Sequence, residues 1–240
     1  MLLAGMQAPR AHRQIAAGVR ALEDRWLAAQ WPKIRPYLPA PPAHVLEVGC
    51  GRLGGFVPAL DRGGYEALGI DPAAPEGDSY RRMEVERAEV RDPANAVVAC
   101  TSLHHVAEPG EVLDKIVKLL APGGVVIVVE WDWERFDEAT AQWCFERLGE
   151  SEGWLRRRRD EWIASGHPWQ RFIEAWANEH RIHSASALLG ELDRRFRRRL
   201  CRRGAYFFAD LANTTETDEL HAIESGEIQA TRIDYVGALP

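Results

Sequence analysis

The apolar positions of this chain follow two alternating periods over its first 131 residues. Short apolar runs bounded by glycine, proline or polar residues predict strands over 44–49, 65–71, 80–86, 95–103 and 125–131. Apolar residues spaced three or four apart predict helices over 10–30, 55–64 and 110–120. Regular alternation of strands and helices favours an α/β fold, in which a parallel sheet has helices on both faces.

The pattern changes after residue 133. Residues 138–200 show helical spacing with no strand between the helices, and seven of the nine tryptophans lie within 131–176. We expect most of these tryptophans to pack between helices, and one or two to wall a pocket for an apolar or aromatic ligand. Two further strands are predicted over 205–211 and 228–236, and a capping box of Thr215 and Asp218 predicts the helix between them.

These elements predict four parts of the chain. They are an N-terminal helical segment with a proline-rich linker, a ligand-binding core, a helical cap inserted between strands 5 and 6, and a closing strand–helix–strand unit. Their bounds are 1–42, 43–133, 134–203 and 204–240.

Glycine and polar residues follow the predicted strands at their carboxyl ends. In a parallel sheet with right-handed crossovers these ends share one edge, which is where ligands bind. The residues expected along this edge are 47–54, Asp71, Glu86, 101–105 and Glu130.

The glycine-rich turn suits two cofactors by its spacing. Gly49, Gly51 and Gly54 form G-x-G-x-x-G, and Asp71 follows at the distance that suits a ribose hydroxyl in NAD-binding proteins. Glu47, however, would repel a pyrophosphate by kcal/mol amounts at roughly 5 Å. S-adenosylmethionine has a sulfonium and an ammonium and no phosphate, so the carboxylate favours this methyl donor. An NAD-dependent oxidoreductase is the alternative.

Four stretches of the chain resemble the class I S-adenosylmethionine-dependent methyltransferases in their order and spacing. They are VLEVGCG from residue 45, GID at 69–71, SLHHV at 102–106 and LLAPGGVVIVVE at 119–130. More narrowly, the chain resembles small actinobacterial-type methyltransferases that share GGFVPAL and EWDWERFDEAT. The resemblance implies a Rossmann-like, seven-stranded, mostly parallel sheet whose last strand is antiparallel and lies beside the fifth. It also implies methyl transfer to a small-molecule acceptor, with S-adenosylhomocysteine as product.

The resemblance also implies which residues contact the cofactor. They are Glu47, Gly49, Cys50, Gly51, Gly54, Asp71, Glu86, Thr101 and Ser102. Asp71 would accept hydrogen bonds from both ribose hydroxyls. Glu86 would lie beside the adenine, with Glu84 or Glu89 as substitutes. Leu53 departs from the family pattern, so we expect the turn to be one residue longer.

His104 and His105 are the candidate catalytic residues. Neutral imidazole can take a proton from a hydroxyl or amine nucleophile, with Glu130 and Asp132 as competing bases. Methyl transfer does not require a base, because positioning can supply much of the acceleration. Neighbouring residues on an extended chain point to opposite sides, so we expect no metal at the histidine pair.

The composition of the chain limits which kinds of binding partner and which cellular location we expect. No apolar run reaches the roughly 18–20 residues that span a bilayer, no secretory signal is evident, and the four cysteines form no C-x-x-C pair. We therefore expect a cytoplasmic protein. The net charge of −6 argues against broad binding of nucleic acid, although residues 150–205 hold 13 arginines and 8 acidic residues.

The arginines of 156–159 and 194–203 would fan around helices. They favour a solvated face over an anionic small molecule, and an anionic small molecule over RNA. The expected partner is a small-molecule acceptor of aromatic or anionic character. An RNA methyltransferase and a non-catalytic relative that binds the cofactor are further alternatives, and the oligomeric state is not predicted.

Overall fold

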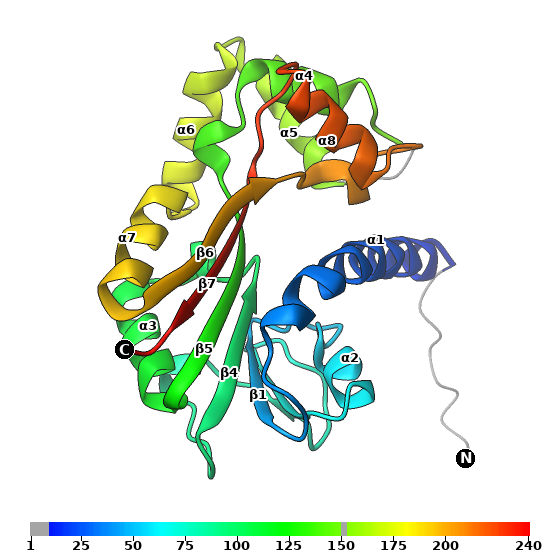
Figure 1. The fold of residues 1–240 in the computed structure, drawn as a ribbon. Coiled ribbons are helices and arrows are strands. Elements are labelled where there is room, and N and C mark those ends of the chain that lie inside the picture. Colours follow the sequence, from blue (N-terminus) through cyan, green and yellow to red (C-terminus); the bar gives the residue numbers. More distant parts are fainter. Residues whose placement is uncertain (1–9, 150–152) are drawn as a thin grey trace, which may run out of the picture.

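The computed structural model describes residues 10–149 and 153–240, with a seven-stranded sheet at its centre (Figure 1). The strands are β1 (His44–Val48), β2 (Glu66–Ile70), β3 (Tyr80–Arg81), β4 (Ala94–Cys100), β5 (Leu120–Trp131), β6 (Arg197–Gly204) and β7 (Arg232–Ala238). Their order is β3-β2-β1-β4-β5-β7-β6. Strands β1 to β5 pair in parallel, and β7 pairs antiparallel with both β5 and β6. The predicted Rossmann-like sheet, with its last strand beside the fifth, is confirmed.

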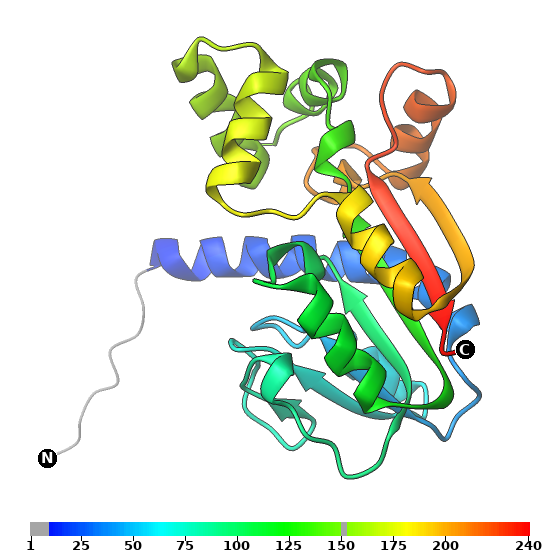
Figure 2. The ribbon, with the colours of Figure 1, turned by 90° about the vertical axis from the view of Figure 1, so that its left-hand side faces the viewer.

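Helices cover both faces of this sheet. The helices are α1 (Arg10–Ile34), α2 (Val57–Arg62), α3 (Pro109–Leu119), α4 (Glu138–Phe145), α5 (Trp154–Ser165), α6 (Trp169–Glu179), α7 (Ala185–Arg195) and α8 (Glu216–Glu224). Helices α3 and α7 lie side by side over one face (Figure 2), and α2 and the end of α1 pack on the other.

The strongest sequence patterns produce the centre of the fold. Helix α3 buries Val112, Leu113, Ile116 and Leu119, which share one face at helical spacing. Strand β5 is apolar and buried along almost all of 125–131, as expected for a strand that is covered on both faces. The capping box of Thr215 and Asp218 is present at the start of α8.

The helices between β5 and β6 divide into two groups. Helix α7 contributes Leu188 and Leu192 to the same core as α3, so it belongs to the layer on the sheet. Helices α4, α5 and α6 form a separate aromatic core with α8 beyond the carboxyl end of β5 (Figure 1), in which Trp169 Nε1 donates to the Phe136 carbonyl at 2.5 Å. A cap function for this group stays a prediction.

The sixth strand corrects the sequence prediction. Residues 197–204 form β6, inside the segment that we expected to be helical, and the expected strand at 205–211 contains a 3₁₀ turn, Phe207–Ala209. The arginines of β6 are tolerated because it is an edge strand whose side chains Arg197, Arg198 and Arg199 are exposed. Its pairing with β7 decides the conformation, and no local periodicity records that pairing.

Several other boundaries differ from the prediction; strand β5, for example, begins at Leu120 and not at Val125. The third strand is two residues long, because Val85–Arg87 turns into a 3₁₀ helix. Helix α1 continues to Ile34 through Pro32, and the last strand runs to Ala238. Within the described ranges, no helix is both long and apolar enough to cross a membrane.

Candidate active site

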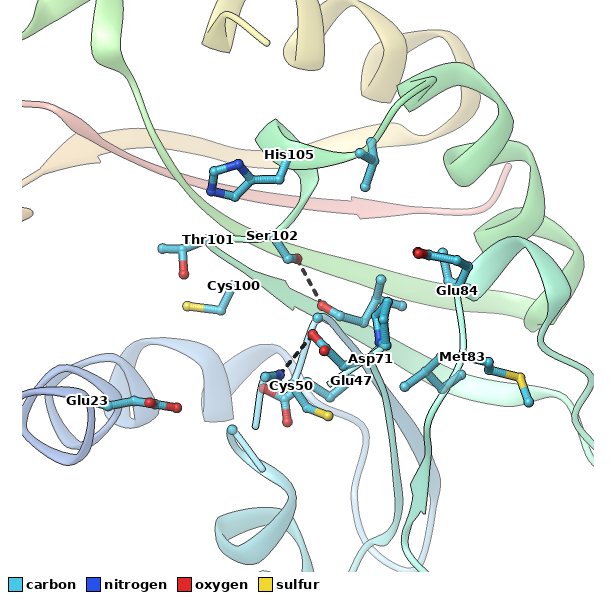
Figure 3. Close-up of a pocket in the computed structure, with 18 of the residues that line it drawn as sticks. Glu23, Glu47, Cys50, Asp71, Met83, Glu84, Cys100, Thr101, Ser102 and His105 are labelled. Atoms are coloured by element: carbon cyan, nitrogen blue, oxygen red, sulfur yellow. Dashed lines mark hydrogen bonds between the residues drawn. The ribbon is translucent and has the colours of Figure 1, made fainter. Parts of the chain in front are cut away.

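A cavity of about 510 Å³ lies at the carboxyl ends of β1, β2 and β4, beside α1 (Figure 3). We call it the edge cavity. Nine of the eleven residues that the sequence singled out line it: Glu47, Gly49, Cys50, Gly51, Asp71, Glu86, Thr101, Ser102 and His105. Residues from four segments of the chain therefore meet at the shared edge of the sheet.

Gly54 and His104 do not line the edge cavity. A Cβ on Gly54 would lie 2.5 Å from the Tyr80 hydroxyl, so this glycine faces β3. With Leu53 in the turn, Gly55 lines the cavity instead. His104 is buried beneath the cavity wall.

The glycine turn opens its backbone to the edge cavity. Gly49 and Gly51 have φ values of +80° and +62°, which residues with a Cβ rarely adopt. A Cβ on Gly49 would lie 2.2 Å from Ser102 Cβ, whereas one on Gly51 would meet nothing within 4 Å. Gly49 is therefore required for packing against the turn that follows β4, and Gly51 leaves room for a ligand.

Asp71 ties β2 to this turn. Its Oδ2 accepts a hydrogen bond from Gly51 N at 3.0 Å, and its Oδ1 accepts one from Ala73 N at 2.6 Å. The carboxylate is thus held at the wall of the edge cavity by backbone amides on both sides.

Glu47 has a structural role that sequence reasoning missed. Its side chain is 2% exposed, and its Oε2 accepts hydrogen bonds from Phe56 N at 2.7 Å and Val57 N at 3.1 Å, at the start of α2. Burial raises the pKa of Glu47 to about 8, the two amide bonds oppose this shift, and the charges of Glu23 and Asp71 add to it. Five carboxyl groups line the edge cavity, those of Glu23, Glu47, Asp71, Glu84 and Glu86, and no lysine or arginine is among its described lining residues.

A second carboxylate, Glu130 at the end of β5, holds the turn that follows β4. Its Oε1 accepts from Ser102 N at 2.9 Å and Leu103 N at 2.6 Å, and its Oε2 lies 2.5 Å from His104 Nδ1. Thr101 begins this turn with a φ of +51°, and Ser102 Oγ donates to the Val48 carbonyl at 2.9 Å. Glu130 and Asp132, the competing bases, are both buried and line no part of the edge cavity.

The histidine pair differs from the expectation in its backbone. Residues Leu103–His105 form a 3₁₀ turn, so the two rings do not point to opposite sides and their centroids are 4.0 Å apart. His105 faces the edge cavity (Figure 3), where burial and, next, His104 lower its pKa to about 4. The His105 imidazole is therefore neutral near pH 7.

Helix α1 supplies lining residues that the sequence did not reveal. Glu23, Trp26 and Leu27 line the edge cavity, and Glu23 projects from α1 toward it (Figure 3). Helical periodicity predicted the helix over 10–30, but it carries no information on what that helix packs against. Nothing in the sequence singled out Glu23.

A second cavity of about 320 Å³ adjoins the first. We call it the side cavity. It shares Glu23, Trp26 and Thr101 with the edge cavity, and Trp154 of α5 and Tyr206 add aromatic walls. The Trp26 and Tyr206 rings are 4.9 Å apart at 63°, an edge-to-face contact.

Comparison with known proteins identifies the family. A family model described as a methyltransferase domain matches residues 20–194, so the chain belongs to that family. The ubiquinone biosynthesis O-methyltransferase of Caulobacter sp. (strain K31) is 31% identical over 146 residues, which cover 55% of this chain and 54% of that protein. The enzyme of the same name from Rhodopseudomonas palustris (strain HaA2) is 25% identical over 164 residues, 62% of this chain and 59% of that protein. The chain thus spans about half the length of the curated relatives it matches.

The solved structures agree on the fold. The S-adenosylmethionine dependent methyltransferase from Mesorhizobium loti superposes with a TM-score of 0.54 at 16% identity, covering 88% of this chain and 97% of that one. The fold is the one found in solved S-adenosylmethionine-dependent methyltransferases. The family match confirms the predicted methyltransferase family and does not favour the NAD alternative.

Proposed function

We propose that this chain transfers the methyl group of S-adenosylmethionine to a small-molecule acceptor. The observation that carries the proposal is the meeting of Glu23, Glu47 and Asp71 around a cavity whose glycine turn exposes its backbone. Carboxyl groups favour a cationic ligand and repel a pyrophosphate. The methyl donor has two cationic groups and a ribose, so the residues present fit it.

Different lining residues would contact different parts of the cofactor. Gly51 allows close approach of the backbone, Glu23 would face the positive charge of the ligand, and Glu47 would do so when ionised. Asp71 is suited to accept hydrogen bonds from ribose hydroxyls. Glu86 lines the edge cavity with the neighbouring Met83 and Val85, which supports its expected place beside the adenine.

The bound cofactor would supply a methyl group that is already activated by its sulfonium. The side chains of the protein would orient the acceptor nucleophile and remove its proton. His105 is the candidate general base, because its neutral ring faces the edge cavity from the turn that carries Thr101 and Ser102. His104, which is buried against Glu130, positions this ring.

The relatives' names support transfer to an oxygen. Both curated relatives are named O-methyltransferases, and both contain a region that matches this chain. An acceptor hydroxyl would need to lose a proton, which is the step that His105 could serve. O-methylation is therefore the favoured reaction.

Binding measurements test the cofactor assignment. Calorimetric titration should show that S-adenosylhomocysteine binds and that NAD⁺ does not. Asp71→Ala should weaken the binding at least tenfold, because about 1.4 kcal/mol corresponds to that factor and two charge-assisted bonds are lost. Asp78→Ala is the matched control, since Asp78 is exposed and lines no part of the edge cavity. Binding of NAD⁺ without binding of S-adenosylhomocysteine would refute the proposal.

A further inference from the structure

The side cavity is walled by aromatic rings from three separate segments of the chain. Trp26 comes from α1, Trp154 from α5 and Tyr206 from the segment after β6. The Trp154 ring is held in place by two edge-to-face contacts, with ring centroids 5.1 Å from Trp131 and 5.4 Å from Trp176. Rigid rings on several sides of a small cavity favour a flat aromatic ligand over an aliphatic one.

The volume limits the size of that ligand. About 320 Å³ is near the lower end of the range for small-molecule pockets, so the side cavity suits a single substituted ring. Thr101, Trp26 and Glu23 belong to both cavities, so a ring in the side cavity borders the edge cavity directly.

Arg157 is the cationic residue in the lining of the side cavity. It belongs to a run of four arginines at the start of α5, and its neighbours are engaged elsewhere. Arg158 pairs with Glu161 at 2.8 Å, and Arg159 with Asp160 at 2.8 Å. Among the residues that the structure describes, the Arg157 guanidinium has no ion pair or hydrogen bond.

Two acidic residues, Glu23 and Asp210, also line the side cavity. Glu23 also lines the edge cavity, where a cationic ligand is proposed. Burial raises the pKa of Asp210 to about 6, and the nearby charge of Arg25 opposes this shift. Arg157 therefore remains as the group that can pair with an anionic substituent.

From these contacts we infer that the side cavity binds the methyl acceptor as a single hydroxylated aromatic ring that carries a carboxylate, with the carboxylate paired to Arg157. The inference rests on the proposed function and adds the substrate class to it. The ring stacks among Trp26, Trp154 and Tyr206, and its hydroxyl is presented toward Thr101 and the edge cavity.

A matched pair of ligands tests the inference. The probes are 3,4-dihydroxybenzoate and catechol, which differ by the carboxylate, titrated into protein saturated with S-adenosylhomocysteine. Dihydroxybenzoate should bind about tenfold more tightly than catechol, and Arg157→Ala should remove this difference while leaving catechol binding unchanged. Arg159→Ala, on the same helix and outside the cavity, should leave the difference intact.

Trp154→Ala tests the aromatic wall. It should weaken the binding of both probes, while retained affinity for S-adenosylhomocysteine shows that the protein is folded. Equal affinity for the two probes, or an unchanged difference in Arg157→Ala, overturns the assignment of the carboxylate. If S-adenosylhomocysteine binds and neither probe does, the acceptor class is wrong and the proposed methyltransferase function stands. If S-adenosylhomocysteine itself does not bind, the proposed function fails first.

Discussion

Replacing Glu130 with alanine should destabilise the protein by about 3–5 kcal/mol, because three buried donor groups lose one shared acceptor. The carboxylate accepts from the Ser102 and Leu103 amides and contacts His104 Nδ1, and all of these groups lose their partner together. Hydrogen bonds to a charged acceptor contribute about 1.5–3 kcal/mol each, and bonds to one group do not add fully. The expected loss of stability is therefore smaller than the sum of three separate hydrogen bonds.

Urea unfolding followed by circular dichroism measures this loss. The midpoint should fall in Glu130→Ala at an unchanged slope, because the surface exposed on unfolding is the same. Glu130→Gln is the control, since its amide oxygen can still accept from the two backbone amides while its NH₂ group faces His104. We expect it to lose about 1–2 kcal/mol, close to the cost of one perturbed hydrogen bond.

The affinity for S-adenosylhomocysteine supplies a second readout. Glu130 does not line the edge cavity, so the affinity should fall only through loosening of the 101–105 turn, and it should fall more in the alanine variant than in the glutamine variant. A loss of stability below about 1 kcal/mol in Glu130→Ala would show that the turn keeps its shape without the carboxylate. The positioning role of Glu130 would then be wrong.

Two further predictions concern the titrating groups. Burial raises the pKa of Glu47 from 4.5 in the unfolded chain to about 8 in the folded protein, so folding takes up a proton between these pH values. The contribution of Glu47 to the free energy of unfolding is therefore complete below pH 4.5 and is lost as the pH rises to about 8. In Glu47→Gln, the urea midpoint should change less between pH 5 and pH 8 than in the wild-type protein. The affinity of the wild-type protein for S-adenosylhomocysteine should rise over the same interval, because the ligand's ammonium favours ionised Glu47. His105→Ala should bind S-adenosylhomocysteine normally and turn over about a hundredfold more slowly, the lower end of the range for loss of a general base, with exposed His167→Ala as control. Because burial lowers the pKa of His105 to about 4, wild-type turnover should show no acidic limb from His105 above pH 5, and normal turnover in His105→Ala excludes the base.

The sequence predicted those parts of the fold in which local pattern and tertiary position agree. Strand β5 is apolar over 125–131 except at Glu130, because both of its faces are covered, so its pattern can be recognised without knowing its neighbours. The carboxyl ends of parallel strands share an edge by topology alone, which is why Asp71 and Thr101 could be grouped although 30 positions separate them.

The features that the sequence did not predict depend on contacts between distant segments of the chain, and a local sequence pattern carries no information on those contacts. Strand β6 is rich in arginine, and only its pairing with β7 makes it a strand. Glu23 lines both cavities because of where α1 packs, and the same residue elsewhere on the helix would be an ordinary surface acid. Glu47 was interpreted from its charge alone, whereas its bonds to Phe56 and Val57 also fix the start of α2.

The position of β7 between β5 and β6 has a consequence for the order in which the molecule can assemble. Strands β5 and β6 do not pair with each other, so the chain between them, which includes Trp154 and Arg157, is anchored at both ends only after β7 inserts. Strands β1 to β5 can pair earlier, because their partners lie closer along the chain. Since distant contacts form slowly, we expect the glycine turn to be built early in folding and the aromatic walls of the side cavity to be completed last.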